Sequence, residues 1–207
     1  MTPGSRSHSI NAMPRLKIIA LMILLVALIP ACGGKPFNVK TKPYTPPQES
    51  GVKAAAGDVT VQAEAVTDED FLYETFDANL ILAGVLPVRV TIANAAQEPV
   101  DLKKARFEIR AAGRAYKAIN AKSAFGKLIS YYGITTYSKL GYKESLMDFA
   151  SHALDLGSPL AAGESRQGML FFQVPVEAAQ SAGLILVARR LDAKKQKADS
   201  SIELKLN

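Results

Sequence analysis

The chain of 207 residues contains one cysteine, Cys32, and only two histidines. A single cysteine cannot form a disulfide within the chain, so its apolar core must stabilise the fold. The sequence also lacks a G-x-S-x-G motif, a glycine-rich phosphate loop, an H-E-x-x-H motif and a paired cysteine motif. A serine hydrolase needs a nucleophile, a base and an orienting acid, and after residue 31 only His152 could act as the base. We therefore expect no catalytic site.

The apolar run at residues 18–29 is too short to span a membrane. It has 12 residues, whereas a spanning helix needs about 20. Arg15 and Lys17 precede it, and Ala31 lies at its far end. This order of basic, apolar and small residues is typical of a leader that is removed after export. We predict a signal peptide over residues 1–31.

The residues at the predicted cleavage point, Ile29-Pro30-Ala31-Cys32, resemble the lipobox of bacterial lipoproteins. The resemblance implies diacylglycerol on the Cys32 sulfur, cleavage before Cys32 and acylation of the new amino terminus. Two or more acyl chains hold a protein stably on a membrane. Gly33 stands where an aspartate would act as a retention signal in enteric bacteria, which implies the outer membrane, facing the periplasm. The alternative is an ordinary secretory signal cut after Ala31.

The positive charge of the sequence gives no indication of a nucleic-acid partner. The formal net charge is +6, but Arg6, Arg15 and Lys17 belong to the predicted leader. Both signs of charge are interspersed in the rest of the chain, and no dense basic block is interleaved with aromatic residues. Apart from covalent lipid, we expect no cofactor and no metal.

Residues 32–57 are predicted to form the lipidated cysteine and a flexible tether. Four prolines lie among lysines, glycines and small residues, without an apolar period. Proline-rich chain extends by about 3.1 Å per residue, so this stretch could hold the domain up to roughly 80 Å from a membrane. The folded domain is predicted over residues 58–207.

The pattern from Asp58 onward predicts a mainly β domain. Val59, Val61 and Ala63 alternate with polar residues, as in a half-buried strand. Asp68 and the acidic residues after it indicate a helix start. Further short strands, about seven in all with turns at regular spacing, favour a β-sandwich.

Residues 122–156 interrupt the strands and are predicted to form two amphipathic helices inserted between them. In the second helix, Asp148, His152 and Asp155 share one face and could hold a metal or act as acid and base. That face is opposite the apolar stripe, so we interpret it as a solvated helix surface.

Two predicted hairpins resemble those of immunoglobulin-like sandwiches in bacterial surface lipoproteins. The first comprises residues 86–94 and 97–102, and the second residues 160–164 and 168–175. The resemblance implies an immunoglobulin-like sandwich and a role in adhesion, assembly or accessory binding. It implies no active site, because the shared motifs are turns and buried strands.

A cluster of tyrosines and lysines in the insert is the candidate binding surface. Tyrosine beside a cation is a composition favoured at interfaces. The alternative is that the rings only cover one end of the sandwich. The candidate residues are Tyr131, Tyr132, Tyr137, Tyr142, Lys139 and Lys143.

Taken together, these features predict a lipid-anchored, non-catalytic binding or structural module of the bacterial envelope. Its expected partners are the membrane, through the acyl chains, and an envelope protein or polymer. An alternative is a small-ligand carrier in which the helices form a lid over an apolar cavity. A hydrolase dependent on His152 is a more distant alternative.

Overall fold

The computed structural model describes residues 34–41, 51–191 and 201–206. The predicted leader and Cys32 lie outside these ranges. Among the described residues, no helix is long and apolar enough to cross a membrane. The strands are β1 (Val52–Ala56), β2 (Val59–Ala65), β3 (Val85–Asn94), β4 (Arg106–Ala111), β5 (Arg114–Ile119), β6 (Ser165–Gln173), β7 (Leu184–Arg189) and β8 (Ser201–Leu206). The helices are α2 (Glu69–Phe76), the 3-10 turn η1 (Leu102–Lys104), α3 (Ala121–Tyr131), α4 (Lys139–Ser151) and α5 (Val176–Ala179).

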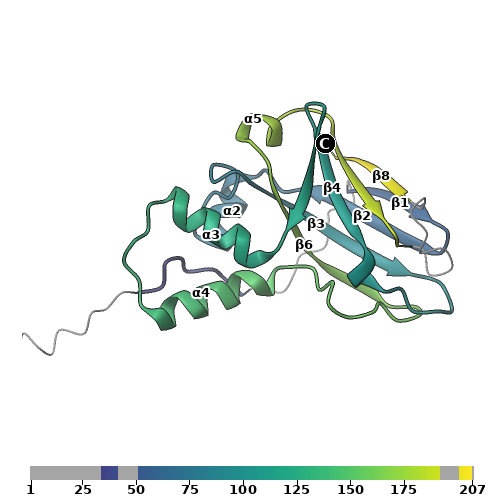
Figure 1. Ribbon diagram of the computed structural model, residues 1–207, viewed down its shortest axis with the longest axis horizontal. Helices are drawn as coiled ribbons and strands as arrows, with labels where there is room; N and C mark the ends of the chain where they lie inside the picture. Colours follow the sequence, from purple (N-terminus) through teal and green to yellow (C-terminus); the bar gives the residue numbers. More distant parts are fainter. Residues whose placement is uncertain (1–33, 42–50, 192–200, 207) are drawn as a thin grey trace, which may run out of the picture. The chain divides into compact units, whose positions relative to one another are not determined.

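The described strands form one eight-stranded antiparallel sheet in the order β1-β2-β3-β6-β5-β4-β7-β8. The sheet curves so far that β8 lies close to β1 and β2, which brings it near to closure as a barrel (Figure 1). The mainly β prediction is confirmed. The two separate sheets of an immunoglobulin-like sandwich are not confirmed, because the strands are linked into a single sheet.

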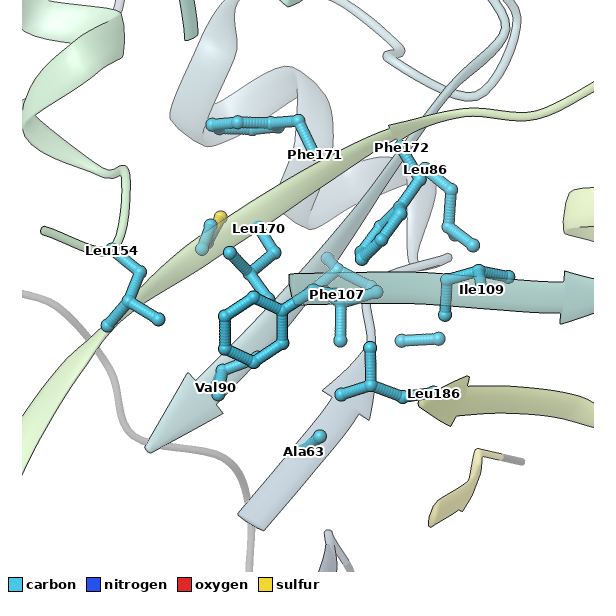
Figure 2. Close-up of a cluster of buried hydrophobic side chains, with 14 of the residues drawn as sticks. Ala63, Leu86, Val90, Phe107, Ile109, Leu154, Leu170, Phe171, Phe172 and Leu186 are labelled. Carbon is cyan, nitrogen blue, oxygen red and sulfur yellow. The ribbon is translucent and has the colours of Figure 1, made fainter. Parts of the chain in front are cut away.

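Side-chain alternation explains how the sheet encloses its core. In β2, Val59, Val61 and Ala63 are buried while the residues between them are partly exposed. In β3, by contrast, every residue from Val85 to Val90 is buried, because both faces of the strand are covered. Figure 2 shows side chains from opposite halves of the sheet meeting in one core. They include Ala63, Val90, Phe107, Ile109, Leu170, Phe172 and Leu186.

The weakest join in the sheet lies between β5 and β6, which pair at only two positions, Ala118 with Phe172 and Ile119 with Phe171. Beyond this point, the residues that follow α4 form backbone hydrogen bonds with the edge of β6. The Met169 N–H donates to the His152 carbonyl at 2.7 Å, and the Leu154 N–H donates to the Met169 carbonyl at 2.9 Å. These bonds satisfy backbone groups that would otherwise form an open strand edge.

The helices cover one end of the sheet and begin where the sequence indicates. The Asp68 carboxylate accepts a hydrogen bond from the Phe71 N–H at 2.6 Å, and α2 buries Leu72 and Phe76. Helices α3 and α4 connect β5 to β6, which confirms a two-helix segment between strands. Asn120 and Ser138 cap these two helices through their side chains.

Two parts of the predicted tether have regular positions in the folded body. Residues 52–56 form β1, all of which pairs with residues 59–63 of β2. Phe37 and Val39 are buried, with exposed fractions of 4% and 7%. The structure therefore differs from the prediction of a flexible tether over residues 32–57, and residues 42–50 lie outside the described ranges.

Gly168→Ala is expected to lower the free energy of unfolding by about 1–3 kcal/mol. A Cβ at Gly168 would overlap the backbone of Leu154 and Ala153, which is fixed by its hydrogen bonds to β6. The midpoint of urea unfolding measures the effect. Gln167→Ala, at the exposed neighbouring position, is the control and should change stability by less than about 0.5 kcal/mol. Equal stabilities for the two variants would contradict this account of the β6 edge.

Candidate functional site

The described chain begins with an extended piece, residues 34–41, which we call the N-terminal segment. It lies against α2 and α4 (Figure 1). The Lys40 N–H donates to the Thr75 carbonyl at 2.9 Å, and the Ser145 hydroxyl donates to the Phe37 carbonyl at 2.6 Å. Two backbone groups of the N-terminal segment are thus satisfied by the helices, next to the buried side chains of Phe37 and Val39.

The start of this segment approaches α4 so closely that only glycine fits. A Cβ built on Gly141 would lie 2.6 Å from the Gly34 carbonyl oxygen and 3.0 Å from the Lys35 nitrogen. The Ser138 N–H also points to the Gly34 carbonyl, at 3.4 Å. Gly141 lies in the first turn of α4. The chain that follows Cys32 is therefore in contact with the amino end of α4.

An aromatic layer lies beneath the N-terminal segment. The Phe37 ring packs edge-on against Phe125, with centroids 5.7 Å apart, and against Tyr132 at 5.9 Å. Below it, Phe149 of α4 lies 5.6 Å from Phe125 and stacks on Phe171 of β6 at 4.9 Å. All of these phenylalanines are buried. The space between helices and sheet is therefore filled by rings.

Charged side chains close the outer edge of this contact. The Lys35 ammonium lies 3.2 Å from Asp148 and 3.4 Å from Glu144, both on α4. The hydrogen bond to Asp148 is the main cause of a raised pKa for Lys35. Solvent screens these exposed pairs, so they add little stability, and Lys35 offsets one of the two negative charges along this flank of α4.

His152, predicted to lie on a solvated helix face, is buried, with an exposed fraction of 6%. Its Nε2 lies 2.8 Å from the Lys40 carbonyl, and its ring packs against Phe76 with centroids 5.0 Å apart. The solvated interpretation is wrong for this residue because the N-terminal segment covers that side of α4. Burial is the main cause of its lowered pKa, which the hydrogen bond to Lys40 and the charge of Asp148 partly offset.

The predicted tyrosine cluster divides into packed and exposed residues. The Tyr132 hydroxyl accepts from the Asn79 N–H at 2.9 Å and donates to the Asn79 carbonyl at 3.3 Å. Burial of this hydroxyl raises the pKa of Tyr132 to about 12. Tyr142 packs against Phe125, with ring centroids 5.6 Å apart. These two tyrosines are partly buried and pack against the core.

Tyr131 and Tyr137 remain exposed, and their rings contact those of Tyr132 and Tyr142. Tyr131 is 53% exposed and lies edge-on to Tyr132 at 5.0 Å, and Tyr137 is 38% exposed and stacks on Tyr142 at 5.4 Å. The two lysines of the predicted surface, Lys139 and Lys143, are also exposed. The structure thus leaves four of the six predicted surface residues accessible.

Sequence reasoning missed two large apolar side chains on the same surface. Leu140 and Met147 are 65% and 62% exposed. Helical spacing places Leu140, Lys143 and Met147 on one face, opposite the buried Gly141, Ser145 and Phe149. The sequence could have indicated this exposed apolar surface, because both residues lie among polar ones on that side of α4. We call Tyr137, Lys139, Leu140, Lys143 and Met147 the α4 patch.

Away from the α4 patch, the described residues show few features suited to metal binding or catalysis. No group of three or more histidine, cysteine, aspartate or glutamate side chains within them could hold a metal ion. A pocket of about 400 Å³ lies between the β1–β3 edge and α2, lined by Arg89, Glu64 and Phe71 among others. Arg89 pairs with Glu64 at 3.1 Å and covers the Phe71 ring at 4.2 Å. The charge of Arg89 therefore interacts with Glu64 and Phe71 within the fold.

No protein-family model and no curated protein matches the chain. A solved structure of a Bacillus subtilis "putative lipoprotein" (ycdA) is 17% identical with a TM-score of 0.41, over 77% of this chain and 39% of that one. A functionally unknown protein from Listeria monocytogenes is 10% identical with a TM-score of 0.38, over 74% of this chain and 80% of that one. The chain therefore spans less than half of the Bacillus protein. Likenesses this weak assign neither a fold family nor a function.

Gly141→Ala is expected to release the N-terminal segment from α4 while the rest of the domain stays folded. The added Cβ would meet the Gly34 backbone, although alanine favours a helix over glycine by about 1 kcal/mol. Hydrogen exchange at residues 35–40 measures the release. Gly126→Ala in α3 is the matched control, since no atom lies within 4 Å of its added Cβ. Unchanged protection in Gly141→Ala would refute the proposed close contact.

His152 is expected to make the stability of the fold depend on pH. The pKa of this histidine is 6.5 when unperturbed and lower in the folded state, so between the two values the unfolded chain binds more protons. Stability is therefore lost as pH falls through 6.5 towards the folded pKa. Urea unfolding at about pH 7.5 and about pH 5 measures the free energy of unfolding of wild type and of His152→Gln. The amount by which wild type is more stable than the variant should decrease as the pH falls.

The comparison with His152→Gln removes the effect of other titrating groups. Hydrogen bonds from Ser158 and Ala161 respectively lower the pKa of Asp155 and Glu164, and both carboxylates are common to the two proteins. A constant difference in stability between wild type and variant across this pH range would contradict the burial of a neutral imidazole.

Proposed function

We propose that the protein is a lipid-anchored, non-catalytic binding or structural module of the bacterial envelope, held by acyl chains on Cys32. The main support is the lipobox-like sequence Ile29-Pro30-Ala31-Cys32 at the end of a short apolar run. It is followed by a segment, residues 34–41, that packs against the helices. A leader removed before Cys32 would leave this packed segment intact. The packed start of the body is thus compatible with cleavage at the lipobox-like sequence.

The filled space beneath the helices supports a module over a ligand carrier. A carrier with the insert as a lid needs an apolar cavity below it, and the Phe125, Phe149 and Phe171 rings occupy that space. The contacts of His152 likewise support a non-catalytic role over a hydrolase. Its Nε2 contacts the Lys40 carbonyl and its ring packs on Phe76, so the imidazole already has partners within the fold.

We extend the proposal to location and fold family. Gly33 after the cysteine favours the outer membrane, facing the periplasm. The two halves of the sheet, β1-β2-β3-β6 and β5-β4-β7-β8, face each other across the core and meet through only two paired positions of β5 and β6. Two facing halves with so few paired positions between β5 and β6 support a sandwich-like relationship to the immunoglobulin-like lipoprotein domains.

Cys32→Ser is expected to release the protein from membranes into the soluble fraction of the envelope. Without the sulfur, no diacylglycerol can be attached, and the folded domain stays intact because residue 32 precedes the packed segment. Membrane fractionation and intact-protein mass measure the loss of the anchor. Wild-type protein that retains its leader and carries a free thiol would contradict the proposed anchor.

Gly33→Asp provides the matched control for location. The acyl chains are unaffected by this change, so the variant should stay membrane-bound. In an enteric host it should move from the outer to the inner membrane. An unchanged distribution would remove the support for the outer membrane while leaving the lipid anchor in place.

A further inference from the structure

We propose that the α4 patch binds the phospholipid surface in which the protein's own acyl chains are inserted. The domain would then lie directly on the bilayer, with the amino end of α4 at the level of the headgroups. This inference rests on acylation of Cys32 and identifies the surface that the anchored module uses against the membrane.

The reach of the chain brings the anchor next to the patch. Two peptide units separate Cys32 from Gly34, so their Cα atoms are at most about 7 Å apart. Gly34 contacts Gly141, and Leu140 is the neighbour of Gly141 in α4. Acyl chains on Cys32 would thus enter the bilayer within about 15 Å of Leu140, little more than the diameter of one helix.

The composition of the patch matches a membrane interface. Leu140 and Met147 expose apolar side chains that can enter the boundary between headgroups and acyl chains. Tyr137 is a residue type enriched at the level of the headgroups. Lys139 and Lys143 are exposed beside them and are attracted to anionic phospholipids.

The N-terminal segment also adjusts the charge of this surface. Helix α4 carries Glu144 and Asp148 on the flank of the patch, and these carboxylates would repel an anionic membrane. Lys35 lies within 3.4 Å of both carboxylates. With the segment in place, Lys35 offsets one of the two negative charges on this flank, so that Lys139 and Lys143 outweigh the one that remains.

A fluorescent label can measure the contact. Because Cys32 is the only cysteine and would be acylated, Leu140→Cys can be labelled selectively in the lipidated protein. The protein is inserted into vesicles of phosphatidylethanolamine and phosphatidylglycerol that carry nitroxide lipids. We expect strong quenching of the label at 140, since apolar side chains of interfacial helices lie roughly 5–10 Å deep. Gln97→Cys, exposed in the turn after β3, is the control position and should stay unquenched.

Charge substitutions test the attraction to the headgroups. Each lysine near an anionic surface contributes about fivefold to binding, so Lys139→Gln with Lys143→Gln should lower the ratio of docked to undocked domain about 25-fold. Lys53→Gln with Lys205→Gln makes the same change of charge at exposed positions of β1 and β8 and should have no effect. Equal effects of the two pairs would overturn the proposed role of the patch.

The outcomes separate this inference from the proposed function. If the acylated protein floats with vesicles but the label at 140 is quenched no more than that at 97, the inference is wrong and the anchor stands. Capture of a protein rather than phospholipid by a photo-crosslinker at position 140 in the intact envelope would also overturn it. Protein that carries no acyl chains and does not float would remove both proposals.

Discussion

The backbone contact between Gly34 and Gly141 decides how the amino-terminal end of the described chain relates to the rest of the protein. A side chain at position 141 would push the segment away, since its Cβ would lie 2.6 Å from the Gly34 oxygen. With the segment in place, Phe37 completes the aromatic layer, and Ser145 and His152 contact the carbonyl oxygens of Phe37 and Lys40. A short polar-looking stretch thereby becomes part of the core, because its buried backbone groups all require partners.

This contact has a direct consequence for the proposed anchor. A flexible tether would let the domain move far from the membrane, whereas Gly34, two residues after Cys32 in the sequence, is already in contact with Gly141. The helical end of the domain would then face the bilayer. The turn after β3 lies at the other end of a ten-residue strand, about 30 Å from the Val85 end that pairs beside the helices. That distant end of the sheet would be the part presented to envelope partners.

The sequence was sufficient for elements with strong local signals. The alternation in β2, the Asp68 cap of α2 and the two helices between β5 and β6 were all predicted and agree with the structure. The N-terminal segment was missed because two buried apolar residues, Phe37 and Val39, are too few to form a periodic signal. The same omission led to the wrong environment for His152, since helical periodicity cannot reveal that a distant segment covers the second side of α4. The arrangement of β5 beside β6 depends on long-range pairing, which local patterns do not encode.

The separation between the folded body and the membrane tests the account most directly. Neutron reflectometry of the acylated protein on a supported phospholipid bilayer measures the thickness of any water layer between headgroups and protein. The account predicts protein density that starts within the headgroup region, with no separate water layer. A water gap of tens of ångströms, towards the roughly 80 Å that an extended proline-rich tether allows, would contradict it.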